Sequence, residues 1–578
     1  MTSEVRRRFS WERLGLAARF ALFSALTYVF VLRWVDPRII HDRFIPVSQG
    51  FSRTAANLAA MLHAFGGAVA YAAGYLHQYY CYGWLGSLLI TAVAVLVCVA
   101  VDRLLPVRPG SWLRLASFVP ALLLLVPYCL YEDPLPMALG VLTALVAANL
   151  YVRMAPRGVV PRAVLVRVMV VLALTAAVFY LAGLMCLVLV GVCLCVEVRQ
   201  WVPRRATPRR RPPPAAGQDR RRALKAAVRY AVQVVVLLAA LVGTAYALFD
   251  QPRKETFQRD YFRHNGMWRE FLEDARRVSL KTFAALELDE KLCLNHDINR
   301  ALYHEGRLLD EMFCFPQDAG ALFLIAHDSA ASPEKSERIA DLLFELGRVN
   351  AAECDAHEML QRFDDLPSTL RLLAEINIVK EQTPAARAFL GYLDDLRNDP
   401  RYERWAERML RRFETEGALP VDERLRRIQR WNAPVDSLGA EGGTLAGDLQ
   451  RLVEGSPDNR MAFEYLMALY LLTNNLEGIA GSASRLRDLG YERIPRHLQE
   501  ALLLYSARVG KEVDLHGYQV APATRRRLIA LLLTAKDFEK AGRSREQFLA
   551  YVAKEHGNTY FWHYFFSAGP TPAGAATQ

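Results

Sequence analysis

Several motifs that identify common enzyme classes are absent from this sequence. It contains no GxxxxGK[ST] or GxGxxG phosphate-binding loop, no GxSxG nucleophile elbow and no HExxH zinc motif. The 9 cysteines include no CxxC pair, and their odd number and wide spacing do not require a disulfide. The sequence therefore argues against the nucleotide-binding, hydrolase and zinc-enzyme classes that these motifs define.

Ionisable side chains are nearly absent from the long apolar runs. Arg167 and Glu197 are exceptions, and both lie near the ends of their run, where they can reach water. Ion-coupled transporters generally carry carboxylates or histidines deep within their spans. This scarcity argues against a proton- or sodium-driven carrier.

Acidic residues are also unevenly distributed. Residues 1–250 hold 10 Asp+Glu against 27 Lys+Arg, a net of +17, whereas residues 251–578 hold 50 against 44, a net of −6. The whole chain of 578 residues is 53% hydrophobic and 23% charged, with a net charge of +11. Because the basic excess belongs wholly to the apolar half, it does not indicate a nucleic-acid-binding surface, and we expect no nucleic-acid partner.

The apolar half is long enough for several membrane spans of about 20 residues each. Residues 163–198 form one apolar run of about 54 Å as a helix, which exceeds a bilayer core of about 30 Å. We interpret this run as two spans that turn near Tyr180–Gly183, with one kinked helix as the alternative. The seven predicted spans are residues 14–35, 82–101, 113–131, 137–152, 163–180, 182–198 and 230–248.

The distribution of Lys and Arg predicts the orientation of these spans. With seven spans, 23 of the 27 basic residues fall on one side, which the positive-inside rule makes cytoplasmic. The basic loop 199–229 contributes 11 of them and also suits anionic lipid head groups. We therefore predict a multi-pass protein of the bacterial inner membrane, with a cytoplasmic N-terminus and a periplasmic C-terminal half.

Residues 54–80 contain no Asp, Glu, Lys or Arg and could be taken for an additional span. An additional span would reverse every later loop and break the charge rule. The segment also fits an amphipathic helix lying flat at the outer interface, and we predict that arrangement. The apolar stripe of this helix comprises Leu58, Met61, Leu62, Phe65, Val69 and Leu76.

From residue 250 the pattern changes to amphipathic helices joined by short loops. Ile339, Leu342, Leu343 and Leu346 follow helical spacing, and Gly347 follows as a stop signal. The predicted fold class is all-α: a seven-helix transmembrane bundle in residues 1–249, then a TPR-like α-solenoid in 250–567. We expect possible sub-blocks at 255–414 and 446–567, and a disordered tail at 568–578.

Carboxylates cluster where the first two outer loops are predicted. Asp36 and Asp42 follow the first span, and Glu132 and Asp133 occupy the next outer loop. Such groups could bind a divalent cation or act as a general base toward a lipid-linked donor. Ordinary solvated loop acids remain the alternative interpretation.

The layout resembles an uncharacterised family of bacterial polytopic membrane proteins, a domain of unknown function with an outer TPR-like helical-repeat domain. This resemblance implies no activity. Its motifs are Gly66-Gly67, Gln78 with the aromatics ahead of Gly83–Gly86, Tyr180–Gly183, the repeat at Trp268, Asn474-Asn475-Leu476 and Gly557-Asn558-Thr559-Tyr560.

A looser likeness is to membrane glycosyltransferases of the GT-C fold, which carry an acidic residue after the first span and an outer juxtamembrane helix. That likeness implies Asp36 or Asp42 as catalytic residues. It also implies that Arg38, Arg43, Glu132 and Asp133 bind the substrate, with a divalent cation as cofactor. The chain departs from this pattern because it has few spans.

Our leading hypothesis is a non-enzymatic envelope protein that presents its periplasmic repeat domain to a protein or an envelope polymer. A GT-C-like transferase that uses a lipid-linked sugar is the alternative. Membrane lipids are the other expected partners, and the sequence predicts no metal site outside the alternative.

Overall fold

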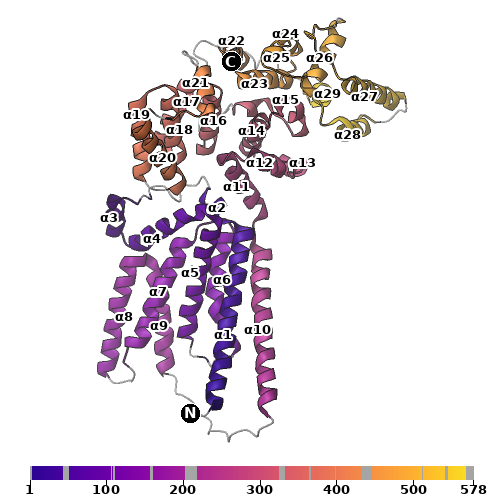
Figure 1. Cartoon of the computed structure of the whole chain (residues 1–578). Coiled ribbons are helices and arrows are strands. Elements are labelled where there is room, and N and C mark those ends of the chain that lie inside the picture. The colour runs from indigo at the N-terminus through magenta and orange to yellow at the C-terminus, as the bar shows by residue number, and fades with distance from the viewer. Residues whose placement is uncertain are drawn as a thin grey trace. The chain divides into compact units, whose positions relative to one another are not determined.

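A computed structural model describes residues 3–42, 51, 53–105, 107, 111–156, 161–201, 218–324, 332–363, 366–396, 399–418, 420–432, 444–510, 512–540 and 544–567. Every regular element in these ranges is a helix, which confirms the predicted all-α class (Figure 1). The chain divides into two compact units. The first comprises Met1–Tyr261 together with Asp395–Glu403, and the second comprises Phe262–Asp394 and Arg404–Gln578.

The first unit is built mainly from long apolar helices. Its main elements are α1 (Ser3–Phe30), which continues as a π-helix (Val31–Val35), α2 (Pro37–His41), α3 (Ala55–His63), α4 (Gly67–His77), a 3₁₀ turn (Gln78–Cys81), α5 (Gly83–Leu104), a 3₁₀ helix (Trp112–Phe118), α6 (Val119–Cys129), α7 (Leu135–Met154), α8 (Pro161–Ala182), α9 (Cys186–Trp201) and α10 (Gln218–Leu248). Helix α11 (Gln251–His264) runs on into the second unit.

Five stretches of the described chain are long and apolar enough to cross a membrane. They are Ala17–Val35, Gly83–Leu104, Trp112–Cys129, Leu135–Met154 and Pro161–Val198. A sixth is possible if Val232–Leu248 and Gln251–His264, which meet at a bend of 75°, count as one span. The structure thus supports several apolar spans without establishing the predicted count of seven.

The 36-residue apolar run does not form one straight helix. It breaks at the 3₁₀ turn Gly183–Met185, where Gly183 has φ +59°, a conformation that favours glycine. Helices α8 and α9, on either side of the break, lie next to each other (Figure 1). Near the ends of these helices distant from the turn, buried Arg167 pairs with Glu197 at 3.3 Å.

Residues 54–80 form two helices, so the prediction of a single continuous helix was wrong. Helix α3 ends at His63, Ala64 is extended, and Gly66 takes φ +82° before α4 begins. The Gly66 N–H donates to the Tyr180 carbonyl at 2.9 Å, which fixes the break against the α8–α9 turn. Helix α4 packs against α7 and α8, whereas α3 buries none of its side chains.

The second unit is an array of short helices. They are α12 (Trp268–Ala275), α13 (Leu280–Ala285), α14 (Leu288–His304), α15 (Leu308–Glu311), α16 (Pro333–Glu345), α17 (Val349–Phe363), α18 (Pro367–Val379), α19 (Thr383–Leu396), α20 (Pro400–Glu416), α21 (Glu423–Trp431), α22 (Leu445–Gly455), α23 (Arg460–Leu472), α24 (Leu476–Gly481), α25 (Arg485–Asp488), α26 (Arg496–Val509), α27 (Pro522–Lys540), α28 (Arg545–His556) and α29 (Tyr560–Trp562).

Several pairs of consecutive helices in this unit pack against each other. The closest pairs include α16 with α17, α17 with α18, and α22 with α23. The stripe predicted in α16 is buried, with Leu342 at 1% and Leu346 at 0% exposure. Gly347 then takes φ +85°, as expected for a residue that ends a helix in the left-handed conformation.

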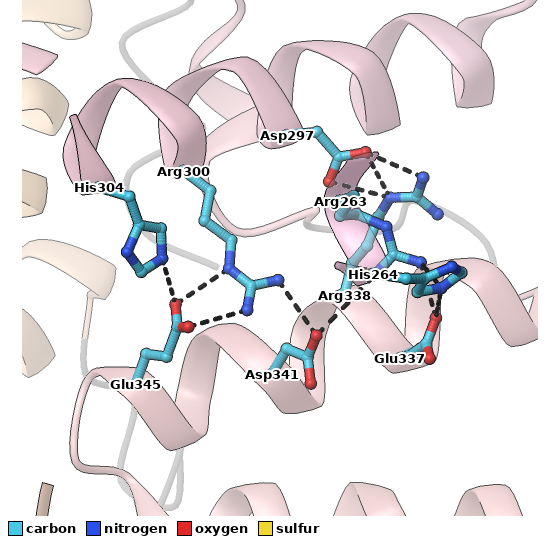
Figure 2. Close-up of polar contacts among 9 residues, drawn as sticks. All are labelled: Arg263, His264, Asp297, Arg300, His304, Glu337, Arg338, Asp341 and Glu345. Atoms are coloured by element: carbon cyan, nitrogen blue, oxygen red, sulfur yellow. Dashed lines mark hydrogen bonds and ion pairs between the residues drawn. The ribbon is translucent and has the colours of Figure 1, made fainter. Parts of the chain in front are cut away.

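A buried network of ion pairs joins α11, α14 and α16 (Figure 2). Glu337, Asp341 and Glu345 are spaced four residues apart and therefore share one face of α16. Arg300 of α14 donates to both oxygens of Glu345 at 3.0 Å and to Asp341 at 3.1 Å. Arg263 of α11 reaches Glu337 at 2.7 Å. Ion pairs of this network therefore hold α11, α14 and α16 in a fixed position relative to one another.

Candidate functional site

Asp36 lies at the N-terminus of α2 and takes the unusual φ of +51° for a non-glycine residue. Its carboxylate accepts hydrogen bonds from the Arg38 backbone N–H at 3.2 Å and from the Arg38 guanidinium at 3.0 and 2.7 Å. The Arg38 guanidinium lies 5.5 Å from the centre of the Tyr261 ring. Asp36 thus caps a helix and is engaged by its own neighbour, and Arg43 lies outside the described residues.

Asp42, the residue that ends α2, is buried in a second set of ion pairs. Its side chain is 5% exposed and accepts from Arg401 Nη2 at 2.7 Å. Arg401 also donates to Asp399 at 2.9 Å, and Asp399 in turn lies 2.8 Å from His41 Nε2. The segment Asp395–Glu403 is therefore held on α2 of the first unit by two carboxylates, a guanidinium and an imidazole.

Asp133 belongs to the same cluster, whereas Glu132 is exposed. One oxygen of Asp133 lies 2.9 Å from Nδ1 of His77, at the C-terminal end of α4. The rings of His77 and His41 are 5.5 Å apart between their centres. Two carboxylate–histidine pairs, Asp399–His41 and Asp133–His77, are consequently neighbours whose histidine rings face each other.

The cluster is shielded from solvent on most sides. Exposed side-chain fractions are 5% for His41, 11% for His77, 6% for Asp133 and 10% for Asp399. The His77 ring packs against Tyr80, with 4.7 Å between the ring centres, and Tyr80 shares a hydrogen bond of 3.0 Å with Tyr128. The two histidines and the two aspartates of the cluster are thus nearly buried.

Opposing charges determine the protonation of the carboxylates. Burial by itself raises the pKa of Asp399, but His41 and Arg401 outweigh it, and the net result is a pKa well below 3.8. Burial also lowers the pKa of Arg401, but Asp399 and Asp42 outweigh it, so this pKa is raised above 12.5. Asp399 and Arg401 therefore remain charged over the whole neutral range.

The structure brings together Asp42 and Asp133 of the six predicted site residues, and it leaves Asp36 with Arg38 as a separate pair. Sequence reasoning missed His41, His77, Asp399 and Arg401. The only sequence signal was His77, which lies off the apolar stripe of its segment. Within the described ranges, no group of three or more His, Cys, Asp or Glu could hold a metal ion.

The second unit carries a different kind of site, a pair of adjoining polar hollows. One has a volume of about 320 Å³ and is lined by Arg460, Glu464, Tyr491 and neighbouring residues. The other has a volume of about 300 Å³ and is lined by Arg496, Gln499, Thr524 and Arg527, among others. Both are lined by Asp310 and Arg493 and therefore adjoin, and we call the two hollows together the Asp310 groove.

Charges of both signs line the Asp310 groove. Arg460 stacks on Tyr491 at 4.6 Å and pairs with Glu464 at 2.8 Å. The Tyr491 hydroxyl donates to Glu464 at 2.6 Å, yet burial raises the pKa of Glu464 above 4.5. Arg493 is 67% exposed and therefore accessible to a ligand.

The fold and sites together describe an all-helical protein with several apolar helices able to cross a membrane and a second helical unit with a polar groove. The chain belongs to DUF6057, a family of unknown function, whose model matches residues 16–208 and 217–568. This match confirms the predicted resemblance to an uncharacterised family, whereas the bacterial origin and the TPR-like domain stay predictions. Neither the search of curated proteins nor that of solved structures gave a match.

Proposed function

We propose that this protein is anchored in a bacterial inner membrane by its first unit and uses the Asp310 groove of its second unit to bind a protein or an envelope polymer. The observation that carries this proposal is the groove itself, which is polar and joins residues from several helices. Two adjoining polar hollows with an exposed arginine, Arg493, suit an extended, hydrophilic ligand.

Seven spans remain our proposed topology. The break at Gly183 separates α8 from α9, and α10 supplies one further apolar stretch. Together with α1, α5, the Trp112–Cys129 stretch and α7, this gives seven spans and leaves 23 of 27 basic residues of the apolar half on the N-terminal side. The second unit then lies in the periplasm.

A topology reporter provides the test of this orientation. A phosphatase fused after Asp250 should be active, and a fluorescent protein that folds only in the cytoplasm should be dark at the same position. The same pair fused within the basic loop 199–229 should give the opposite result. A cytoplasmic signal after Asp250 would contradict the seven-span topology.

We further propose that the second unit is a TPR-like α-solenoid. Its helices α16, α17 and α18 pack in succession, as the helices of such arrays do (Figure 1). Solenoids present grooves formed by successive repeats as extended binding surfaces. The Asp310 groove differs from this pattern, because it lies between α15, α23 and α26, which are not successive in the chain.

Photocrosslinking in intact cells tests the binding role with the full chain. A benzoylphenylalanine introduced at Ala523, which lines the groove, should give a discrete adduct, whereas the same group at the exposed Leu280 should not. The charge reversal Arg493→Glu should abolish the adduct. Arg411→Glu, which alters an equally exposed ion pair on α20, should leave it intact. Identical adducts from all variants would refute the proposal.

The transferase alternative receives less support from the geometry. A catalytic carboxylate must reach its substrate, yet Asp42 is buried against Arg401, and Asp36 is held by Arg38. If Asp36→Asn and Asp42→Asn insert normally into the membrane but abolish function, the transferase becomes the better hypothesis. If both variants remain functional, it loses its candidate residues.

A further inference from the structure

Three arginines line the second hollow of the Asp310 groove, which has a volume of about 300 Å³. Arg493 precedes α26, Arg496 begins this helix, and Arg527 lies in the second turn of α27. All three side chains are at least partly exposed, so a ligand in the hollow can reach them. The hollow therefore gathers three guanidinium groups, the side chains best suited to binding oxyanions.

Two of these arginines share a single carboxylate. Arg496 Nε donates to Glu500 Oε1 at 3.1 Å, and Arg527 Nη1 donates to the same oxygen at 3.3 Å. Burial alone would raise the pKa of Glu500, but contacts with His497 and Arg496 outweigh burial and hold this pKa below 4.5. His497, whose Nδ1 lies 3.1 Å from Glu500, can only add positive charge. One negative charge thus faces two guanidinium groups.

The other acids that line the second hollow do not remove this excess of positive charge. Asp310 is paired with Arg493. Glu311 is paired with two arginines, Arg276 at 2.8 Å and Arg307 at 2.9 Å. Together with the two arginines on the buried glutamate, five arginines face three carboxylates, so the hollow and its supports carry a net charge of +2.

The N-terminus of α27 adds positive potential to the same hollow. Gln499 Oε1 accepts from the Ala521 N–H at 2.9 Å and from the Thr524 hydroxyl at 3.0 Å, which fixes this end of α27 on α26. Both of these partners line the hollow, as does Ala523. The first N–H groups of a helix have no acceptor within it, and the helix dipole is positive there. Helix α27 has 19 residues and no acidic residue in its first turn to offset that charge.

We infer that the second hollow of the Asp310 groove binds a phosphate monoester carried by an envelope polymer, with Arg493, Arg496 and Arg527 as its donors. This inference rests on the binding role proposed for the groove. A phosphate monoester has a charge of about −1.5 to −2 at neutral pH and three acceptor oxygens. These properties match the excess charge of the hollow and its three guanidinium groups. A carboxylate has one charge and two oxygens and would leave part of the excess uncompensated.

The lining of the groove favours a polymer over a protein as the carrier of that phosphate. Protein interfaces bury an apolar core with aromatic anchors. Among the described residues that line the two hollows, the only aromatic residue is Tyr491, and Arg460 stacks on its ring. The first hollow also contains Glu464, paired with Arg460, and the exposed Glu492. Such polar groups suit the hydroxyl groups of a hydrophilic polymer.

Calorimetric titration of the full chain in lipid nanodiscs tests the phosphate site with defined probes. Glycerol phosphate should bind about tenfold more tightly than succinate, a dicarboxylate of similar charge, at equal ionic strength. Arg527→Gln should weaken the binding of glycerol phosphate about tenfold, the loss expected for one charge-assisted contact. Arg525→Gln provides the matched control, because Arg525 is exposed on the same helix and lies outside the hollow. Equal affinity for the two probes, or equal weakening by the two variants, would overturn the inference.

Hydrogen exchange separates a lost site from a loosened fold. Saturating glycerol phosphate should slow the exchange of amides 521–528 in the parent protein, a result that requires no variant. Arg493→Gln removes a side chain that does not contact Glu500, and it should reduce the affinity as Arg527→Gln does. Unchanged exchange in the parent protein, or full affinity in Arg493→Gln, would contradict the assigned donors.

The photocrosslink at Ala523 distinguishes failure of this inference from failure of the proposed function. In cells grown with radioactive phosphate, the adduct should carry label that remains on a large fragment after protease digestion. An unlabelled adduct, or label that protease releases on small peptides, would leave the binding role intact and overturn the phosphorylated polymer. The absence of any adduct would contradict the proposed function, and the titration would still decide whether the hollow binds phosphate.

Discussion

The carboxylate of Asp310, in α15, accepts a hydrogen bond of 2.6 Å from the backbone N–H of Arg496, the first residue of α26. Helix α26 has no side-chain cap of its own because Pro495 occupies its N-cap position. The same carboxylate accepts from the Arg493 guanidinium at 2.9 and 3.3 Å. Asp310 therefore caps a helix that lies 186 residues further along the chain, and it lines both hollows of the groove.

We expect Asp310→Ala to destabilise the second unit by about 1 kcal/mol, the usual cost of removing a helix cap. Asp310→Asn should cost less because an amide oxygen still accepts the Arg496 N–H. The amides of the first turn of α26 should exchange faster in the alanine variant. Asp488→Asn, which changes an exposed carboxylate 3.9 Å from Arg485, provides the control and should leave this exchange unaltered.

Two carboxylates of the network in Figure 2 should differ in how much they contribute to stability. Glu345 is buried and paired through both oxygens with Arg300, so Glu345→Gln should destabilise the protein by about 3 kcal/mol. Burial raises the pKa of Asp341, so its ionised form is disfavoured in the folded state. Asp341→Asn should therefore fall within about 1 kcal/mol of the parent protein. Urea unfolding of the full chain in detergent gives both values, and equal losses would contradict this difference.

Acid should weaken the same network. Burial opposes ionisation of Glu337, but Arg263 and His264 outweigh it and hold the pKa of Glu337 well below 4.5. The unfolded chain binds protons first as the pH falls, so the stabilisation is complete above about pH 4.5 and is lost below it. Circular dichroism of the full chain should show thermal unfolding at a lower temperature at pH 3.5 than at pH 6. Glu337→Gln should flatten that dependence, and an unchanged slope would contradict the assignment.

Helical periodicity predicted the local structure of the second unit because each helix buries one face. The stripe from Ile339 to Leu346 is α16 and its cap, followed by Gly347 in the left-handed conformation. Periodicity did not predict the break within residues 54–80. The stripe of apolar residues continues through Ala64–Gly66, although helix α3 ends before this segment and α4 begins after it. That break depends on a hydrogen bond to Tyr180, which no local pattern encodes.

The candidate cluster was only partly predictable for the same reason. Loop position predicted that Asp42 and Asp133 lie on the same side of the bundle, and they do join one cluster. Their cationic partners were not predicted: Asp42 meets Arg401, 359 residues away, and Asp133 meets His77 of another helix. Such contacts arise from tertiary packing, and a single sequence carries no spacing rule for them.

Two glycines that follow helices provide a test of packing at the end of α16. Gly347 and Gly417 both have positive φ, +85° and +72°, so alanine should cost about 1 kcal/mol at either position through backbone strain. A Cβ at Gly347 would also lie 2.6 Å from the Trp431 carbonyl oxygen, whereas a Cβ at Gly417 meets nothing within 4 Å.

Gly347→Ala should therefore be more destabilising than Gly417→Ala by a further 1–3 kcal/mol, roughly the cost of overpacking a well-packed core. The difference between the two variants in urea unfolding of the full chain isolates the steric contribution because the backbone strain is common to both. Trp431 fluorescence should shift in Gly347→Ala alone, since the backbone and Cβ of Trp431 must move to admit the new methyl group. Equal destabilisation by the two variants would show that α21 does not pack against the end of α16 as described.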